Sequence, residues 1–220
     1  MSTLTDTVQT DVSAFLQANH TLLFNERDLQ THLATWLRAS ASRYDDVDME
    51  YYVPWRELED YVWRNELKMD IVVSRGSEYV PVELKYKTRR VQRCFMRFGE
   101  ALPQPADVMK NQGAQDLGMY DFWKDVRRIE LVKNRFTRVK GGLAVFVTND
   151  PAYLKAANPA SNHVQFSMAE GWHATGRHWL NPDSASARRH PGFRMDRAYP
   201  IRWHQKEVEG VAFYYCIVII

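Results

Sequence analysis

The amino-acid sequence predicts an α/β fold in which helices flank a mixed central β-sheet. Helical periodicity alternates along the chain with short runs rich in β-branched and aromatic residues. One such run, residues 143–148, is apolar throughout, which is typical of a strand covered on both faces. The 220 residues, 45% of them hydrophobic, predict one domain over residues 1–220, with its core at about 25–148.

Two helices are predicted first. The apolar face of the first consists of Val8, Val12, Phe15 and Leu16. That helix should end near Asn19. The second should begin after Asn25, a good N-cap, and end within residues 39–42. Its core-facing stripe consists of Leu29, Leu33, Trp36 and Leu37.

Three strands should follow, at residues 47–54, 68–74 and 79–87. Pro54 closes the first of them, because proline cannot donate to a ladder. The second and third should pair as a hairpin through the turn at Arg75. Strand alternation predicts one face with Met69, Ile71 and Val73 and the opposite face with Asp70 and Val72.

A helix over residues 119–132 should lie flat on the sheet. Its predicted apolar face consists of Met119, Phe122, Trp123, Val126, Ile129 and Val132. Its predicted polar face consists of Asp121, Lys124, Asp125, Arg127 and Arg128. After the central strand at 143–148, residues 155–200 predict a long excursion from the core, and residues 211–220 a buried C-terminal strand.

Composition excludes several classes of protein. The formal charge of +2 is too balanced for a general nucleic-acid coat, so any such contact should use local patches. Two cysteines make no disulfide framework, and together with the absence of a secretory pattern they predict a cytoplasmic location. The longest apolar run, residues 211–220, is too short for a membrane helix, so we expect no membrane partner. No phosphate-binding glycine loop, GxSxG or HExxH motif is present.

Three charged residues stand on strands that should be half-buried. Asp70 lies within an apolar run, and Glu83 and Lys85 share one face of the next strand. If the hairpin turns Asp70 toward Glu83, two carboxylates and an ammonium converge. Two acidic oxygens suit Mg²⁺, which can polarise a phosphoryl oxygen and activate water, while Lys85 orients or helps to deprotonate that water.

These residues resemble the motif of the PD-(D/E)XK, or restriction-endonuclease-like, nucleases: Asp70, then Glu83-Leu84-Lys85, with an acidic residue on a preceding helix. That residue is Glu26, which shares a helical face with Leu29. The resemblance implies that Asp70 and Glu83 bind Mg²⁺ or Mn²⁺, that Lys85 positions water, and that Glu26 is an auxiliary catalytic acid. Met69 stands where the motif has proline.

The resemblance also implies a restriction-endonuclease-like core and hydrolysis of DNA phosphodiester bonds, in restriction, phage defence, repair or mobile-element processing. DNA is the expected partner, and a homodimer is a further expectation from the family. The helix after the motif supplies a Gln or Lys in some branches, with Gln112 and Gln115 as candidates. The predicted phosphate-binding residues follow the site directly: Lys87, Arg89, Arg90 and Arg93.

Less specific interpretations stand beside this one. The hairpin would be an ordinary amphipathic pair if Glu83 and Lys85 faced water, and Glu26 would then complement the helix dipole. A nuclease fold without catalysis, binding nucleic acid or a protein, is the main alternative function. An unrelated α/β protein is the third possibility, and it would be favoured if Asp70 and Glu83 lay on opposite faces of the sheet. A second Glu-Leu-Lys, residues 66–68, precedes Asp70 in a polar segment and predicts a solvated strand entry.

Overall fold

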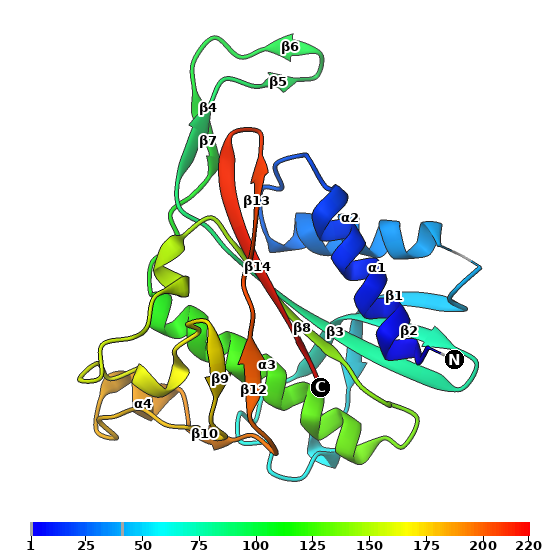
Figure 1. Cartoon of the computed structure of the whole chain (residues 1–220), viewed down its shortest axis with the longest axis vertical. Helices are drawn as coiled ribbons and strands as arrows, with labels where there is room; N and C mark the ends of the chain where they lie inside the picture. The colour runs from blue at the N-terminus through cyan, green and yellow to red at the C-terminus, as the bar shows by residue number, and fades with distance from the viewer. Residues whose placement is uncertain (1, 41) are drawn as a thin grey trace.

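The computed structural model describes residues 2–40 and 42–220. A six-stranded sheet in the order β1-β2-β3-β8-β14-β13 forms its centre (Figure 1). Only β3 and β8 pair in parallel, and the other neighbours are antiparallel. The strands are β1 (Asp46–Val53), β2 (Leu67–Arg75), β3 (Glu78–Lys87), β8 (Leu143–Thr148), β13 (His204–Val208) and β14 (Val211–Ile219). The predicted mixed sheet with flanking helices is confirmed.

Helix boundaries follow local capping. Helix α1 (Leu4–Ala18) begins a turn before the apolar stripe, because Thr3 and Asp6 form a capping box. Helix α2 (Glu26–Ala39) begins where predicted, with the Asn25 side chain accepting a hydrogen bond from the Asp28 amide at 2.9 Å. Helices α3 (Gln115–Arg135) and α4 (Ala185–Arg189) complete the α-helices in the described part of the chain.

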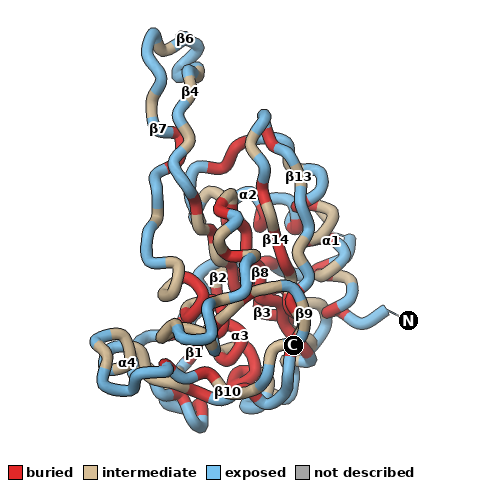
Figure 2. Tube along the Cα trace, turned by 60° about the vertical axis from the view of Figure 1, so that its left-hand side comes forward, coloured by how far each residue is buried: buried red, intermediate tan, exposed pale blue. Residues whose placement is uncertain are grey.

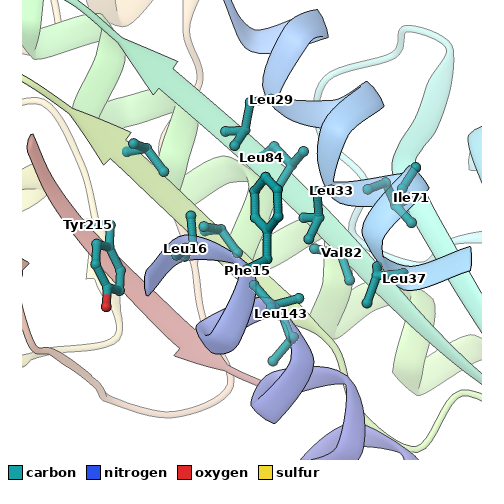
Figure 3. Packing of buried hydrophobic residues seen from close by; sticks show 14 of the residues in the cluster. Phe15, Leu16, Leu29, Leu33, Leu37, Ile71, Val82, Leu84, Leu143 and Tyr215 are labelled. Carbon is teal, nitrogen blue, oxygen red and sulfur yellow. The ribbon is translucent and has the colours of Figure 1, made fainter. Parts of the chain in front are cut away.

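The sheet is covered on both faces. Helices α1 and α2 pack their leucines and Phe15 on one face, against Val82 and Leu84 of β3 (Figure 3). Helix α3 covers the other face, with Phe122 edge-on against Phe146 of β8 and Trp123 buried in the same cluster. Every residue of β8 is buried, as its unbroken apolar run predicts.

Two regions without sequence periodicity fold into small elements. Residues 88–111 form a projecting arm with β4 (Val91–Arg93), β5 (Met96–Arg97), β6 (Glu100–Ala101) and β7 (Ala106–Met109). The predicted excursion packs on α3 through buried Phe166, Trp179 and Phe193. Helix η2 (Pro151–Leu154) leads into it. Its elements are η3 (Val164–Phe166), β9 (Gly171–His173), β10 (Gly176–Arg177), α4, β11 (Phe193–Arg194) and β12 (Tyr199–Ile201). Helix η1 (Trp55–Glu57) follows β1. Within the described ranges, no helix has both the length and the apolar character needed to cross a membrane.

Gly142 directly precedes β8 and lies against Ile129 of α3, so its replacement should destabilise the protein. A Cβ atom at this position would lie 2.3 Å from Cγ2 of Ile129 and 3.0 Å from the carbonyl oxygen of Pro81. We expect Gly142→Ala to lower the free energy of unfolding by about 1–3 kcal/mol, measured by urea denaturation. Gly113→Ala is the matched control, because no atom lies within 4 Å of its added methyl group. Equal losses in both variants would contradict this reading of the helix–sheet contact.

Candidate active site

Strand β3 sends its side chains alternately to the two layers of the protein. Val82, Leu84 and Tyr86 join the core under α1 and α2. Glu83 and Lys85 point the other way, toward α3. The two charged residues of the motif therefore share one face, as predicted, but that face is covered by a helix rather than by water.

Asp70 is joined to the motif by its own side chain. Its Oδ2 accepts a hydrogen bond of 2.6 Å from the amide of Leu84, and its carbonyl oxygen accepts one of 2.7 Å from the Gln30 side chain. Regular pairing of β2 with β3 stops at Ile71 and Val82, one position before Asp70 would face Glu83. The structure therefore brings Asp70 to the centre of the Glu-Leu-Lys segment.

The predicted alternation of β2 is wrong at this point. Ile71 and Val73 pack under α1 and α2, whereas Met69 packs with Val72 in the core under α3. The alternation breaks at Asp70, whose carbonyl and carboxylate bond to a helix side chain and to β3 outside the regular ladder. Period-2 reasoning assumes an undistorted ladder, so it could not place Met69.

Burial makes both carboxyl groups easier to protonate. Burial, followed by the nearby carboxylate of Asp125, raises the pKa of Asp70 to about 6 against the opposing hydrogen bond from Leu84. Glu83 is 4% exposed, and burial together with Asp125 and Asp70 raises its pKa well above the ordinary value. Among the described residues, none donates a hydrogen bond to its buried Oε1 atom. When ionised, Glu83 therefore carries a buried carboxylate oxygen without a hydrogen bond.

Lys85 supplies the positive charge of the cluster. Its Nζ atom lies 3.0 Å from Oδ2 of Asp125 and 3.9 Å from Oε1 of Glu26. Burial alone would lower the pKa of Lys85, but the carboxylates of Asp125, Glu26 and Glu83 outweigh it and raise that pKa above its usual value. Lys85 is therefore an ammonium at neutral pH and not a proton acceptor.

Glu26 reaches the site from the first turn of α2. Its Oε2 accepts a hydrogen bond of 2.8 Å from the amide of Tyr86, while Oε1 faces Lys85. The helix-dipole interpretation of this residue accounts for neither contact. The structure thus places all four predicted residues of the site in one cluster.

Asp125 belongs to the site although the sequence predicts it on the polar face of the helix. It is 2% exposed, and Arg128 lies beside it with 3.4 Å between Nη1 and Oδ1. Arg127, assigned to the same polar face, is also buried and pairs with Glu130. The overlooked signal was spacing: Asp125 is three residues after Phe122 and four before Ile129, so it lies in the apolar stripe.

A groove of about 430 Å³ opens beside the cluster. Asp70 and Glu26 line it together with Lys87 and Gln112, and Glu50 of β1 lines it as well. Its complete lining is Asn25, Glu26, Arg27, Gln30, Glu50, Asp70, Tyr86, Lys87 and Gln112. Of the two candidate glutamines, Gln112 therefore reaches the groove. Gln115 instead donates a hydrogen bond of 3.2 Å to Asp150.

The predicted phosphate-binding residues lie along the start of the arm. Lys87 faces the groove, and Arg93 belongs to β4. Arg90 pairs with Asp107 at 2.8 Å across the arm, and Nε of Arg89 lies 4.0 Å from Asp150. The second Glu-Leu-Lys differs from the first, because Lys68 and Glu66 form a solvent-exposed pair at 3.5 Å.

The carboxylates of the cluster outnumber its bases. The acids of the cluster are Glu26, Asp70, Glu83 and Asp125, and its bases are Lys85 and Arg128. The excess of carboxylates and the unpartnered Oε1 of Glu83 are features that an oxygen-seeking cation would satisfy. In the described residues no three His, Cys, Asp or Glu side chains converge as a preformed ligand set, and Mg²⁺ commonly completes its shell with water.

No protein-family model, no curated protein and no solved structure matches this chain.

Proposed function

We propose that this chain is a nuclease of the PD-(D/E)XK type that uses Mg²⁺ or Mn²⁺ to hydrolyse DNA phosphodiester bonds. The observation that carries the proposal is the hydrogen bond from the Leu84 amide to Asp70, which holds the aspartate against the centre of Glu83-Leu84-Lys85. Glu26, which comes from a separate helix, joins the same cluster, with its Oε1 3.9 Å from Nζ of Lys85.

The order of elements adds support for a restriction-endonuclease-like core. Helix α2, the antiparallel strands β1, β2 and β3, helix α3 and the parallel strand β8 come in this order along the chain, with the arm inserted between β3 and α3. This is the helix, three-stranded meander, helix and strand order that the resemblance implies. The cluster lies toward the end of β3, where the chain continues into the basic arm.

Each residue has a distinct part in the proposed hydrolysis. Asp70 and Glu83 would hold the cation, which would polarise the phosphoryl oxygen and activate water. Lys85, held as an ammonium by Asp125, orients the attacking water and offsets negative charge that grows on the phosphoryl oxygens. Glu26 and Asp125 act as positioning residues, because both contact Lys85 directly.

The proposal is tested by incubating the protein with linear and circular DNA in Mg²⁺, in Mn²⁺ and in chelator. We expect cleavage only with metal and a rate about 10²–10³-fold lower for Lys85→Ala, the loss typical when one charge-stabilising donor is removed. Lys68→Ala is the matched control, since it alters the same tripeptide at the exposed copy. Equal cleavage by both variants, or cleavage in chelator, would contradict the proposal.

One observation favours the alternative of a binding module without catalysis. Lys85 and Arg128 both lie against the buried acids, so the cluster also resembles a partly neutralised structural network. DNA binding without cleavage in either metal, by a protein whose circular dichroism shows a folded chain, would select this alternative.

A further inference from the structure

The arm over residues 88–111 projects away from the body of the protein (Figure 1) and is largely exposed (Figure 2). Its stem is the β4–β7 pair, and its tip is the β5–β6 pair. Its base lies at the groove, because Lys87 and Gln112 line the groove and the Gln112 amide donates a hydrogen bond to the Thr88 carbonyl. Any molecule that follows the arm is therefore led toward Asp70.

The turn at the tip holds a residue that suits it poorly. Arg97 pairs with Glu100, so Phe98 and Gly99 are the two central residues, with φ of 53° and 82°. Two-residue hairpin turns with positive φ at both positions favour Asn-Gly, and a bulky side chain in the left-handed region is strained. Phe98 therefore does not stabilise the turn.

Phe98 does not pack in the hydrophobic core either. Its exposed fraction is 105%, and that of Met96 on the same tip is 61%. An apolar side chain that is both strained and fully exposed lowers the stability of the free protein and adds nothing to its packing. Its contribution should come from contact with another molecule.

The charge of the arm indicates which molecule. Residues 88–111 contain five lysines and arginines and two acids, whereas the whole chain has a formal charge of only +2. The positive charge is thus concentrated beside the acidic groove, as expected for a surface that follows a phosphate backbone. The Arg97 guanidinium lies 4.1 Å from the Phe95 ring centroid and 4.7 Å from that of Phe24, which braces the tip against the loop before α2.

We propose that the arm is a DNA-binding wedge in which the basic stem contacts phosphates and Phe98 inserts among the bases. Aromatic side chains stack on bases without strong sequence preference, and apolar wedges unstack base steps. The substrate class that this adds to the proposed nuclease is DNA with accessible bases, such as forks and single-stranded ends. The inference rests on the proposed function only for the direction in which DNA is led.

Forked DNA carrying 2-aminopurine at the junction tests the wedge, in chelator so that no strand is cut. We expect 2-aminopurine fluorescence to rise when the wild-type protein binds. Phe98→Asn should abolish that rise and weaken binding roughly ten- to hundred-fold, measured by fluorescence anisotropy. Because asparagine favours this turn, the variant should fold at least as well as the wild type. Leu180→Asn, at another exposed apolar residue, is the matched control and should change neither signal.

The outcomes separate this inference from the nuclease proposal. Unstacking by the wild type without cleavage in Mg²⁺ or Mn²⁺ supports the wedge and contradicts the nuclease. Cleavage with no rise in fluorescence, or equal binding by wild type and Phe98→Asn, overturns the wedge and leaves the nuclease standing. Phe98-dependent binding to vesicles of anionic lipid, with no Phe98-dependent binding to DNA, also overturns it.

Discussion

Asp70→Asn is expected to abolish DNA cleavage and at the same time to stabilise the metal-free protein. The amide removes the charge that would hold the cation, while its oxygen can still accept the hydrogen bond from Leu84. Burial raises the pKa of Asp70 to about 6 from an ordinary 3.8, so ionisation costs the native state about 3 kcal/mol at neutral pH. Asparagine has no such cost.

The sign of the effect depends on pH. The native state binds the Asp70 proton more tightly than the unfolded state, so this group favours folding of the wild type at low pH. That stability is lost as the pH rises from about 4 to about 6. Urea denaturation in chelator should therefore show Asp70→Asn more stable by up to about 3 kcal/mol at pH 7.5, with the difference disappearing near pH 4.

Divalent cations provide the control for this prediction. Mg²⁺ or Mn²⁺ should raise the melting temperature of the wild type, because a ligand that binds only the native state stabilises it, and should leave Asp70→Asn nearly unchanged. Gly113→Ala, which alters no charge, should respond as the wild type does. A loss of stability in Asp70→Asn at pH 7.5, or cleavage at the wild-type rate, would contradict this prediction. Asp70 would then have only a structural role, as acceptor of the hydrogen bond from the Leu84 amide.

Removing the charge of Lys85 or of Asp125 alone is expected to cost up to about 3–5 kcal/mol of stability, because each change takes the nearest counter-charge from its buried partner. The two groups lie 3.0 Å apart, with side chains 17% and 3% exposed. The variants Lys85→Met and Asp125→Leu should each show this loss in urea denaturation. The double variant should be more stable than either single one, since an apolar pair can replace a buried ion pair at little cost.

Cleavage should not follow stability in this series. The double variant should recover part of the free energy of unfolding, but it has no ammonium at the phosphoryl group. We therefore expect its cleavage rate to stay at the level of Lys85→Met. Both quantities are measured on the same preparations, by urea denaturation and by the cutting of linear DNA in Mg²⁺. Recovery of cleavage in the double variant would show that Lys85 has a structural role and takes no direct part in catalysis.

Local sequence signals predicted the elements that build the site. Asn25 marked the start of α2 because its side chain accepts from an amide three residues away, a contact within one turn. Glu83 and Lys85 were placed on one side of β3 because alternation is a property of the strand alone. The buried run of β8 was recognised in the same way.

Contacts between distant segments decided the rest. Asp125 meets Lys85 forty residues away, and Glu26 meets the Tyr86 amide sixty residues away, so neither contact could be read from neighbouring residues. The break in alternation at Asp70 and the projecting arm were missed for the same reason. Propensity and periodicity report the conformation of a short segment, whereas the charges that face one another depend on how helices pack across the finished sheet.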